Sequence, residues 1–228
     1  MLTVACVLRA GGIYDVSWVA RLRAQVRRHL KIEHRFHIIC DSSIIWDDAR
    51  LSVCGGDTIH TVADCWPGWW AKLELFKPDR FSGPVLYFDL DTLLIGDLSE
   101  IASAAAEHDL IMLRDFCRPG GLGSGVMAWR SQEVVAPLYG AFTARPRMFM
   151  ECHRVGGDQE FIEVRAHLKK VAHWQDVVPG QIVSYKADAC ERGAPAAARV
   201  MCLHGKPKFT DMPADNWARR EWEMACVT

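Results

Sequence analysis

Two aspartates, Asp89 and Asp91, are the residues whose type and spacing most directly indicate chemistry. They follow an apolar run at residues 85–88, which we expect to form a buried strand. Because strand side chains alternate, both carboxylates should leave on the same side, at the end where open α/β sheets bind ligands. Two carboxylates facing one crevice repel each other unless a cation lies between them. The pair therefore predicts a site for Mg²⁺ or Mn²⁺, which prefer oxygen ligands.

The elements that must position these aspartates alternate between strands and helices. Short apolar runs predict strands at residues 4–8, 36–40, 85–88, 110–113, 126–129 and 199–203. Helices are expected from Asp15 or Ser17 to Leu30 and at residues 71–76, 99–106 and 158–167. Such alternation implies parallel pairing. The predicted fold class is α/β, with one domain built on a mostly parallel central sheet flanked by helices.

Two local patterns have a structural interpretation. The first helix should expose a basic face, interpreted as solvated, which carries Arg21, Arg23, Arg27, Arg28 and Lys31. The glycine-rich segment 120–125 is expected to be a loop, and its glycines miss the spacing of a dinucleotide-binding motif. That loop would let backbone approach a sugar or phosphate closely, or would form a plain turn.

Composition excludes several classes of protein. Half of the 228 residues are hydrophobic and the net charge is −1, which argues against a disordered chain and against broad binding of nucleic acid. No apolar run approaches the length of a transmembrane segment, and the N-terminus lacks the features of a signal peptide. The nine cysteines are scattered, odd in number and free of C-x-x-C spacing, so a cytoplasmic location is expected.

Five segments together resemble the motifs of one enzyme family. Residues 87–94 (YFDLDTLL) resemble the D-x-D segment of the glycogenin-like, retaining glycosyltransferases of GT-A fold. Four other segments resemble that family's motifs in the same order, namely 70–76 (WAKLELF), 123–127 (GSGVM), 157–159 (GDQ) and 204–208 (HGKPK). The resemblance covers most of residues 4–210 and is that of a short, bacterial-type member.

The resemblance implies both a fold and an activity. The chain would be a single GT-A (Rossmann-like) domain over residues 1–228, with its core at about 4–210 and a C-terminal tail at 211–228. It would move a sugar, with retention, from a nucleotide-diphosphate sugar, usually a UDP-sugar, to an acceptor. That acceptor could be a glycan, a lipid-linked sugar or a protein. Mn²⁺ or Mg²⁺ would be the cofactor.

The same resemblance implies roles for individual residues. The metal ligands would be Asp89, Asp91 and His204. The residues at the reacting sugar would be Asp158, Gln159 and Lys72. The nucleotide-sugar would be bound by Tyr14, Lys72, Asp89, Leu90, Asp115, Gly123, Ser124, Gly205 and Lys208. No covalent nucleophile is assigned, because retaining enzymes of this kind are thought to react by front-face attack.

Several of these positions allow alternatives. Asp158 is also a suitable helix N-cap, and Tyr14 could be a surface tyrosine rather than a platform for the base. Gly123 stands where the family has Asn. Either Lys206 or Lys208 could contact phosphate, and we favour Lys208.

Two other functions compete with sugar transfer. The segment 88–92 (FDLDT) differs little from the nucleophile motif of haloacid-dehalogenase-like phosphohydrolases, in which Asp89 would be phosphorylated. That motif lacks its glycine here and lies far from the start of the chain. A non-catalytic module that binds a nucleotide-sugar is the other alternative, kept open by Gly123.

Overall fold

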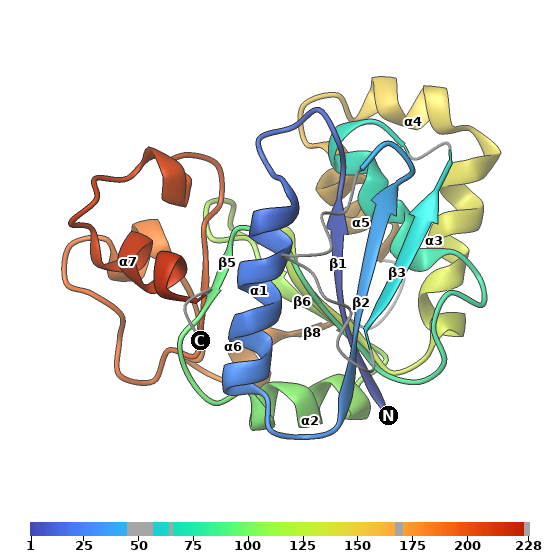
Figure 1. Ribbon diagram of the computed structural model, residues 1–228. Helices are drawn as coiled ribbons and strands as arrows, with labels where there is room; N and C mark the ends of the chain where they lie inside the picture. Colours follow the sequence, from blue (N-terminus) through green and yellow to red (C-terminus); the bar gives the residue numbers. More distant parts are fainter. Residues whose placement is uncertain (45–56, 64–65, 167–170, 226–228) are drawn as a thin grey trace.

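A computed structural model describes residues 1–44, 57–63, 66–166 and 171–225 of the chain (Figure 1). Its central sheet has seven strands in the order β3-β2-β1-β4-β7-β6-β8. The strands are β1 (Leu2–Leu8), β2 (His34–Asp41), β3 (Thr58–Val62), β4 (Val85–Phe88), β6 (Leu110–Arg114), β7 (Leu122–Trp129) and β8 (Ala172–His173). All neighbouring pairs are parallel except those that β7 makes with β4 and β6. The predicted α/β class with a mostly parallel sheet is confirmed.

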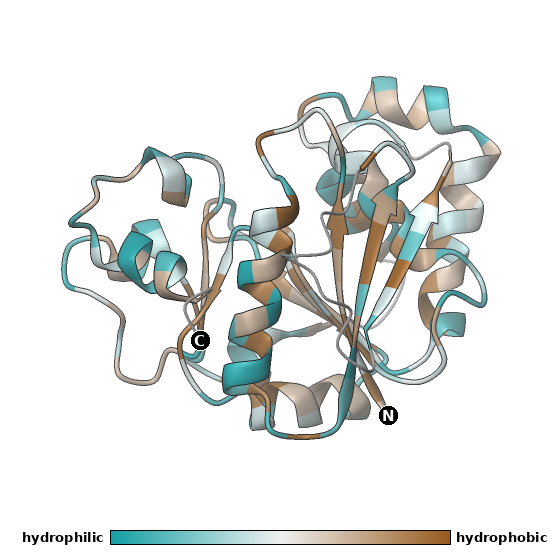
Figure 2. Ribbon diagram, viewed as in Figure 1, coloured by the Kyte–Doolittle hydropathy of each residue, from teal (hydrophilic) through white to brown (hydrophobic). Residues whose placement is uncertain are grey.

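Helical segments cover both faces of this sheet. On one face lie α1 (Val16–His29), α2 (Ser99–Glu107) and α6 (Trp174–Val177), and on the other lie η1 (Gly68–Phe76), α3 (Gln132–Ala144), α4 (Pro146–Cys152) and α5 (Gly157–Ala166). Each face forms a hydrophobic core, the first under α1, α2 and α6 and the second under η1, α3, α4 and α5. In β1 the side chains of Val4 and Cys6 enter the first core, and that of Ala5 enters the second. Burial on both faces explains why strands such as β1 and β4 are almost continuously apolar, as the brown colour of β1 shows in Figure 2.

A smaller sheet extends the first core. It orders β5 (Thr92–Leu94), β10 (Val200–Cys202) and β9 (Ile182–Ser184). The π-helical segment η2 (Tyr185–Ala189), the 3₁₀ helix η3 (Phe209–Asp211) and the helix α7 (Trp217–Met224) accompany this sheet. Trp222 of α7 packs on Trp18 of α1, with ring centroids 4.5 Å apart, so the C-terminal tail closes over this core.

Helix α1 follows the sequence prediction except on its basic face. The Asp15 side chain accepts a hydrogen bond from the Ser17 N–H and caps the helix, and the predicted apolar stripe is buried. Arg23, predicted to be solvated, is instead buried and paired with Asp57. The prediction was wrong there because β3 brings an aspartate beside the helix, which the helical pattern alone cannot reveal.

Other boundaries differ from the predicted ones. Strand β7 begins at Leu122, so much of the glycine-rich segment is strand rather than loop. Helix α5 begins at Gly157, which places Asp158 in its first turn. The predicted end of that helix at His167 and the cysteines Cys54, Cys65 and Cys226 lie outside the described residues. No helix in the described parts of the chain is both long and apolar enough to cross a membrane.

Candidate active site

The two aspartates of the D-x-D segment lie in a turn directly after β4. The strand ends at Phe88, and the Thr92 N–H donates to the Asp89 carbonyl at 3.1 Å to close the turn. The Asp89 N–H is held by the Gly125 carbonyl of β7 at 2.8 Å. The strand's C-terminal end is thus where the sequence placed it. The alternation argument holds for Asp89 but was wrong for Asp91, because the turn directs the two carboxylates to different lysines, Lys72 and Lys208.

Asp89 faces the side of the sheet that η1 covers. Tyr87, two residues earlier, lies on the same face, and its hydroxyl donates to Asp89 Oδ1. Lys72 of η1 reaches the same carboxylate, with Nζ 3.0 Å from Oδ1. The period-2 alternation of β4 therefore continues far enough to bring Asp89 to the helix that carries Lys72.

Lys72 is the centre of a buried ion-pair cluster. Its Nζ lies 3.1 Å from Asp158 Oδ2 and 3.0 Å from Ser124 Oγ, in addition to Asp89. Burial alone would lower the pKa of this ammonium, but the carboxylates of Asp158 and Asp89 raise it above its ordinary value. The two carboxylates thus favour the charged form of Lys72.

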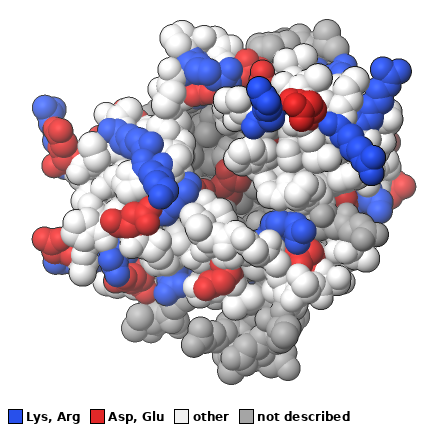
Figure 3. Space-filling view, turned by 90° about the horizontal axis from the view of Figure 1, so that it is seen from above, with Lys and Arg blue, Asp and Glu red and all other residues white. Residues whose placement is uncertain are grey.

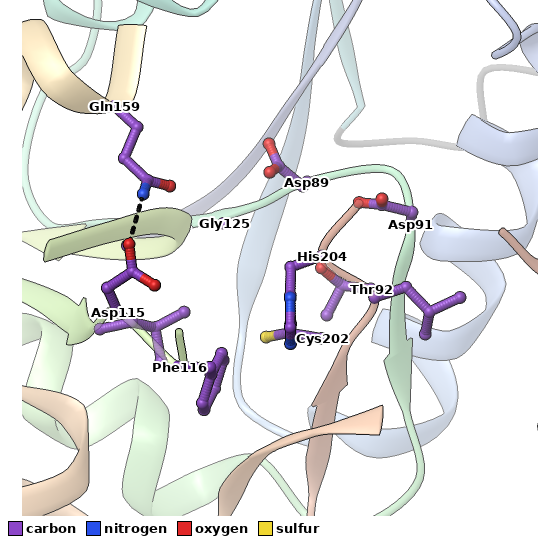
Figure 4. Close-up of a pocket in the computed structure, with 12 residues that line it drawn as sticks. Asp89, Asp91, Thr92, Asp115, Phe116, Gly125, Gln159, Cys202 and His204 are labelled. Carbon is purple, nitrogen blue, oxygen red and sulfur yellow. Dashed lines mark hydrogen bonds between the residues drawn. The ribbon is translucent and has the colours of Figure 1, made fainter. Parts of the chain in front are cut away.

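Asp158 and Gln159 project from the first turn of α5 toward β7. Burial raises the pKa of Asp158, and Lys72 opposes that shift. The Ser124 hydroxyl donates to Asp158 Oδ2 at 3.2 Å. Gln159 Nε2 donates to Asp115 Oδ2 at 3.0 Å (Figure 4). The structure thus joins the predicted Asp115, Ser124, Asp158 and Gln159 in one hydrogen-bonded group.

Asp91 is buried on the opposite side of the turn. The Tyr14 hydroxyl donates to Asp91 Oδ2 at 3.0 Å, and Lys208 Nζ forms an ion pair with the same oxygen. Burial and the charge of Asp89 raise the pKa of Asp91, while Lys208 and Tyr14 lower it. Lys206 is exposed, so the geometry favours Lys208 of the two lysines as the one that reaches the site.

His204 lines a cavity together with Asp89 and Asp91, but its imidazole turns toward Phe116 and away from the two aspartates (Figure 4). The two rings stack with centroids 5.5 Å apart, and His204 Nε2 lies 2.7 Å from Ser184 Oγ. Burial, with the charge of Lys186, lowers the pKa of His204, which favours the neutral form of its ring. Within the described residues, no three His, Cys, Asp or Glu side chains are grouped closely enough to hold a metal ion.

The donor chemistry around the turn nevertheless fits a divalent cation. Asp89 and Asp91 are close enough that the charge of one raises the pKa of the other, which is the repulsion that a cation between them would relieve. His204 has the neutral ring that a ligand needs but shares its Nε2 with Ser184. Asp89 and Asp91 are therefore the residues best placed to hold a metal, and the part of His204 stays a prediction.

Two adjoining cavities open on this turn. The larger has a volume of about 870 Å³ and is lined by Tyr14, Lys72, Asp89, Leu90, Asp91, Ser124, Asp158, Gln159, His204, Gly205 and Lys208, among others. The smaller, of about 120 Å³, lies between the aspartates, Asp115, Gly123, Gln159 and His204. All of the predicted site residues therefore line one cavity or the other. Figure 3 shows a hollow on this face, with acidic atoms at its base and basic side chains around it.

Gly123 fits tightly into the wall of the smaller cavity. A Cβ atom at this position would lie 3.1 Å from Leu113 Cβ, so Leu113 would have to move to admit any side chain. Strand β6 shifts register between Met112 and Leu113, opposite this part of β7. The neighbouring strand thus takes up space that a side chain at position 123 would need.

Several contributing residues were missed by the sequence reasoning. Tyr87 could have been found, because it precedes Asp89 by two residues and so shares its face. Ser184 had no local signal, since β9 meets His204 only in the folded chain. Asp41, at the end of β2, holds the loop that carries Tyr14 by accepting the Ala10 N–H at 2.6 Å.

Asp41 provides a test of how this loop is held. Burial alone would raise its pKa, but hydrogen bonds from Ala10 and Ser43 and the charge of Arg9 lower it from 3.8 to about 2. A lowered pKa means that the stability is present above the unfolded value and is lost as pH falls toward 2. Asp41→Asn should cost about 1–2 kcal/mol of unfolding free energy at neutral pH, discounted because water screens the Arg9 pair.

Urea denaturation at neutral pH and near pH 3 checks this expectation. The difference between Asp41→Asn and the unaltered protein should shrink at the lower pH, and exposed Asp215→Asn should show no such difference at either pH. A constant deficit at both values would contradict an electrostatic origin.

Similarity to known proteins is found in the structure and not in the sequence. The sequence matches no protein-family profile and no curated protein. The glycosyltransferase GlyE of Streptococcus pneumoniae TIGR4 is similar at 14% identity with a TM-score of 0.70, over 100% of this chain but only 61% of GlyE. The galactosyltransferase LgtC, solved with donor and acceptor sugar analogues, is 14% identical with a TM-score of 0.67, over 99% of this chain and 95% of LgtC. An active-site mutant of LgtC is 13% identical with a TM-score of 0.68, over 99% of this chain and 95% of the mutant. At such identity the likeness shows the fold, which is the predicted GT-A fold.

Proposed function

We propose that this chain is a glycosyltransferase that moves a sugar from a nucleotide-diphosphate sugar, a UDP-sugar by resemblance, to an acceptor. The observation that carries the proposal is the Lys72–Asp89–Asp158–Ser124 cluster, which forms the floor of a cavity of about 870 Å³ in a GT-A fold. A cavity of this size accommodates a nucleotide-sugar. The cluster lies at the C-terminal end of β4, where α/β sheets bind nucleotides.

The charges of the site suit a diphosphate. Lys208 and Lys72 each lie within ion-pair distance of an aspartate of the turn. A diphosphate that enters the cavity would meet both ammonium groups, which hydrogen-bond phosphate oxygens strongly. Tyr14 lines the same cavity, and we assign its ring to the nucleotide base.

A divalent cation completes this proposal. Asp89 and Asp91 would hold it, with His204 as the further ligand that the resemblance implies. When bound, Mn²⁺ or Mg²⁺ would act as a Lewis acid for the diphosphate leaving group.

The chain's own residues have roles at the reacting sugar. The bond from the anomeric carbon to the diphosphate oxygen breaks, the acceptor hydroxyl oxygen bonds to that carbon, and its proton passes to the departing diphosphate. Lys72 stabilises the negative charge that develops on that leaving group. Asp158 and Gln159 hold the sugar in place through hydroxyl hydrogen bonds. Retention is part of the proposal and rests on the resemblance of the motifs alone.

A screen of UDP- and other nucleotide-sugars with MnCl₂ tests the proposal. We expect one donor to be hydrolysed slowly without acceptor, and chelation by EDTA to stop the reaction. If no nucleotide-sugar binds with or without Mn²⁺, the proposal is wrong. Binding without turnover over a broad acceptor panel would favour the non-catalytic module. Release of phosphate from phosphomonoesters through an aspartyl-phosphate at Asp89 would favour the phosphohydrolase.

A further inference from the structure

Trp69 is a large aromatic side chain that the fold leaves open to solvent. It is 54% exposed, whereas its neighbour Trp70 is 5% exposed and stacks on Phe142 in the core. A tryptophan ordinarily buries most of its surface on folding, so this degree of exposure needs a reason. Trp69 lines the larger cavity, so its exposed surface belongs to the site and not to an unrelated part of the exterior.

The geometry of η1 aligns Trp69 with Lys72. This segment is a 3₁₀ helix, in which three residues complete one turn, so residues three apart lie on the same face. Lys72 points to the floor of the cavity, and Trp69 is therefore placed on the same side, one turn before it. The aromatic ring and the buried cation therefore line the same cavity.

Gly157 of α5 packs directly against the indole ring of Trp69. Its φ is +62°, and a Cβ atom there would lie 2.4 Å from Trp69 Nε1 and 2.6 Å from Trp69 Cε2. Only a residue without a side chain lets the indole approach the backbone that immediately precedes Asp158. The contact with α5 holds one edge of the Trp69 ring in place, while about half of the residue's surface stays exposed. An aromatic ring held in this way is a preorganised binding surface.

Depth within the cavity separates this ring from the groups assigned to the donor. Lys72 and Asp158 are 8% and 5% exposed, respectively, so they lie at the floor, while Trp69 lies at the mouth. Two further apolar side chains, Ile13 and Val155, line the same cavity and are strongly exposed. A molecule that binds over an already seated donor would meet these residues first.

We propose that the acceptor is a saccharide and that one of its pyranose rings stacks on Trp69. An exposed aromatic platform in the same cavity as the buried polar groups assigned to the donor matches a ligand with an apolar ring face. This inference rests on the proposed glycosyltransfer, because it names the substrate class of the same site. It gives Trp69 the role of a residue that binds acceptor and aligns its hydroxyl.

Saturation-transfer NMR with defined glycosides tests the inference. The probes are the methyl glycosides of glucose, galactose and N-acetylglucosamine, with maltose and lactose, each in the presence of UDP and MnCl₂. We expect at least one probe to bind, Trp69→Ala to weaken that binding by about tenfold or more, and Trp69→Phe to keep most of it. Val164→Ala, at an exposed residue of α5 outside both cavities, is the matched control and should bind normally.

Gly157→Ala is a second variant, which keeps the indole of Trp69 but places a methyl group in the space that the ring occupies. It should weaken the same probe while the thermal unfolding temperature confirms a folded protein. Binding that is unchanged in Trp69→Ala, or no binding of any probe by the unaltered protein, would overturn the inference.

Donor hydrolysis without acceptor separates the two proposals. Trp69→Ala should raise the KM for the nucleotide-sugar far less than it weakens glycoside binding. If that KM rises as much as the glycoside affinity falls, the ring serves the donor sugar and the acceptor assignment is wrong. If no nucleotide-sugar binds at all, the proposed function itself has failed, whatever the glycoside result.

Discussion

Asp91→Asn is expected to lower kcat/KM for sugar transfer by about 10³-fold or more. Asp91 is buried, lies between Tyr14 and Lys208, and shares the turn with Asp89. The amide keeps the shape of the side chain and can still accept the Tyr14 hydrogen bond. It lacks the negative charge that a divalent cation would need at this position, so the effect isolates charge from packing.

The measurement is the rate of nucleotide-sugar hydrolysis and transfer over a range of MnCl₂ concentrations. The variant should need more Mn²⁺ for its residual activity, and its unfolding temperature should fall because Lys208 loses its ion-pair partner, while the protein stays folded at the assay temperature. Asp97→Asn changes an exposed aspartate shortly after the turn and should retain full activity. Activity of Asp91→Asn within tenfold of the unaltered protein would contradict a role for this carboxylate in holding the metal.

Lys72→Ala should both inactivate and destabilise the protein. The substitution leaves Asp158 and Asp89 around a cavity with no cation, and removing one partner of a buried pair typically costs about 3–5 kcal/mol. For a chain of this length, that loss corresponds to a fall of roughly 10 °C in unfolding temperature. Transfer should fall by about 10³-fold, because Lys72 would no longer stabilise charge on the leaving diphosphate.

A double variant separates the two effects of Lys72. Lys72→Ala with Asp158→Asn removes the more deeply buried of the two uncompensated carboxylates, so it should regain part of the lost stability but none of the activity. Lys77→Ala, at the exposed end of η1, is the matched control and should change neither property. Calorimetry and the hydrolysis assay measure both quantities on the same samples. Normal stability of Lys72→Ala alone would contradict the buried ion pairs that the geometry indicates around this lysine.

Local features of the chain were predictable because they depend on near neighbours in sequence. Asp15 caps α1, the apolar stripe of that helix is buried, and the aspartate turn follows a buried strand. Capping and periodicity act within a few residues, so they are readable without a fold. The same reasoning failed for Arg23, whose partner Asp57 approaches from another element.

The sequence by itself determined which residue types would meet at the site. The motif resemblance identified Asp89, Asp91, Lys72, Asp158 and Lys208, and the structure places them all on the same cavity.

The tertiary structure alone decided how these residues pair. It joins Lys72 to both Asp89 and Asp158, gives Lys208 to Asp91, turns His204 toward Phe116 and exposes Trp69 at the mouth. The physical reason is that strand order and helix crossovers set which distant segments approach. Charge pairing, burial and exposure act only between side chains that the fold has already brought within reach.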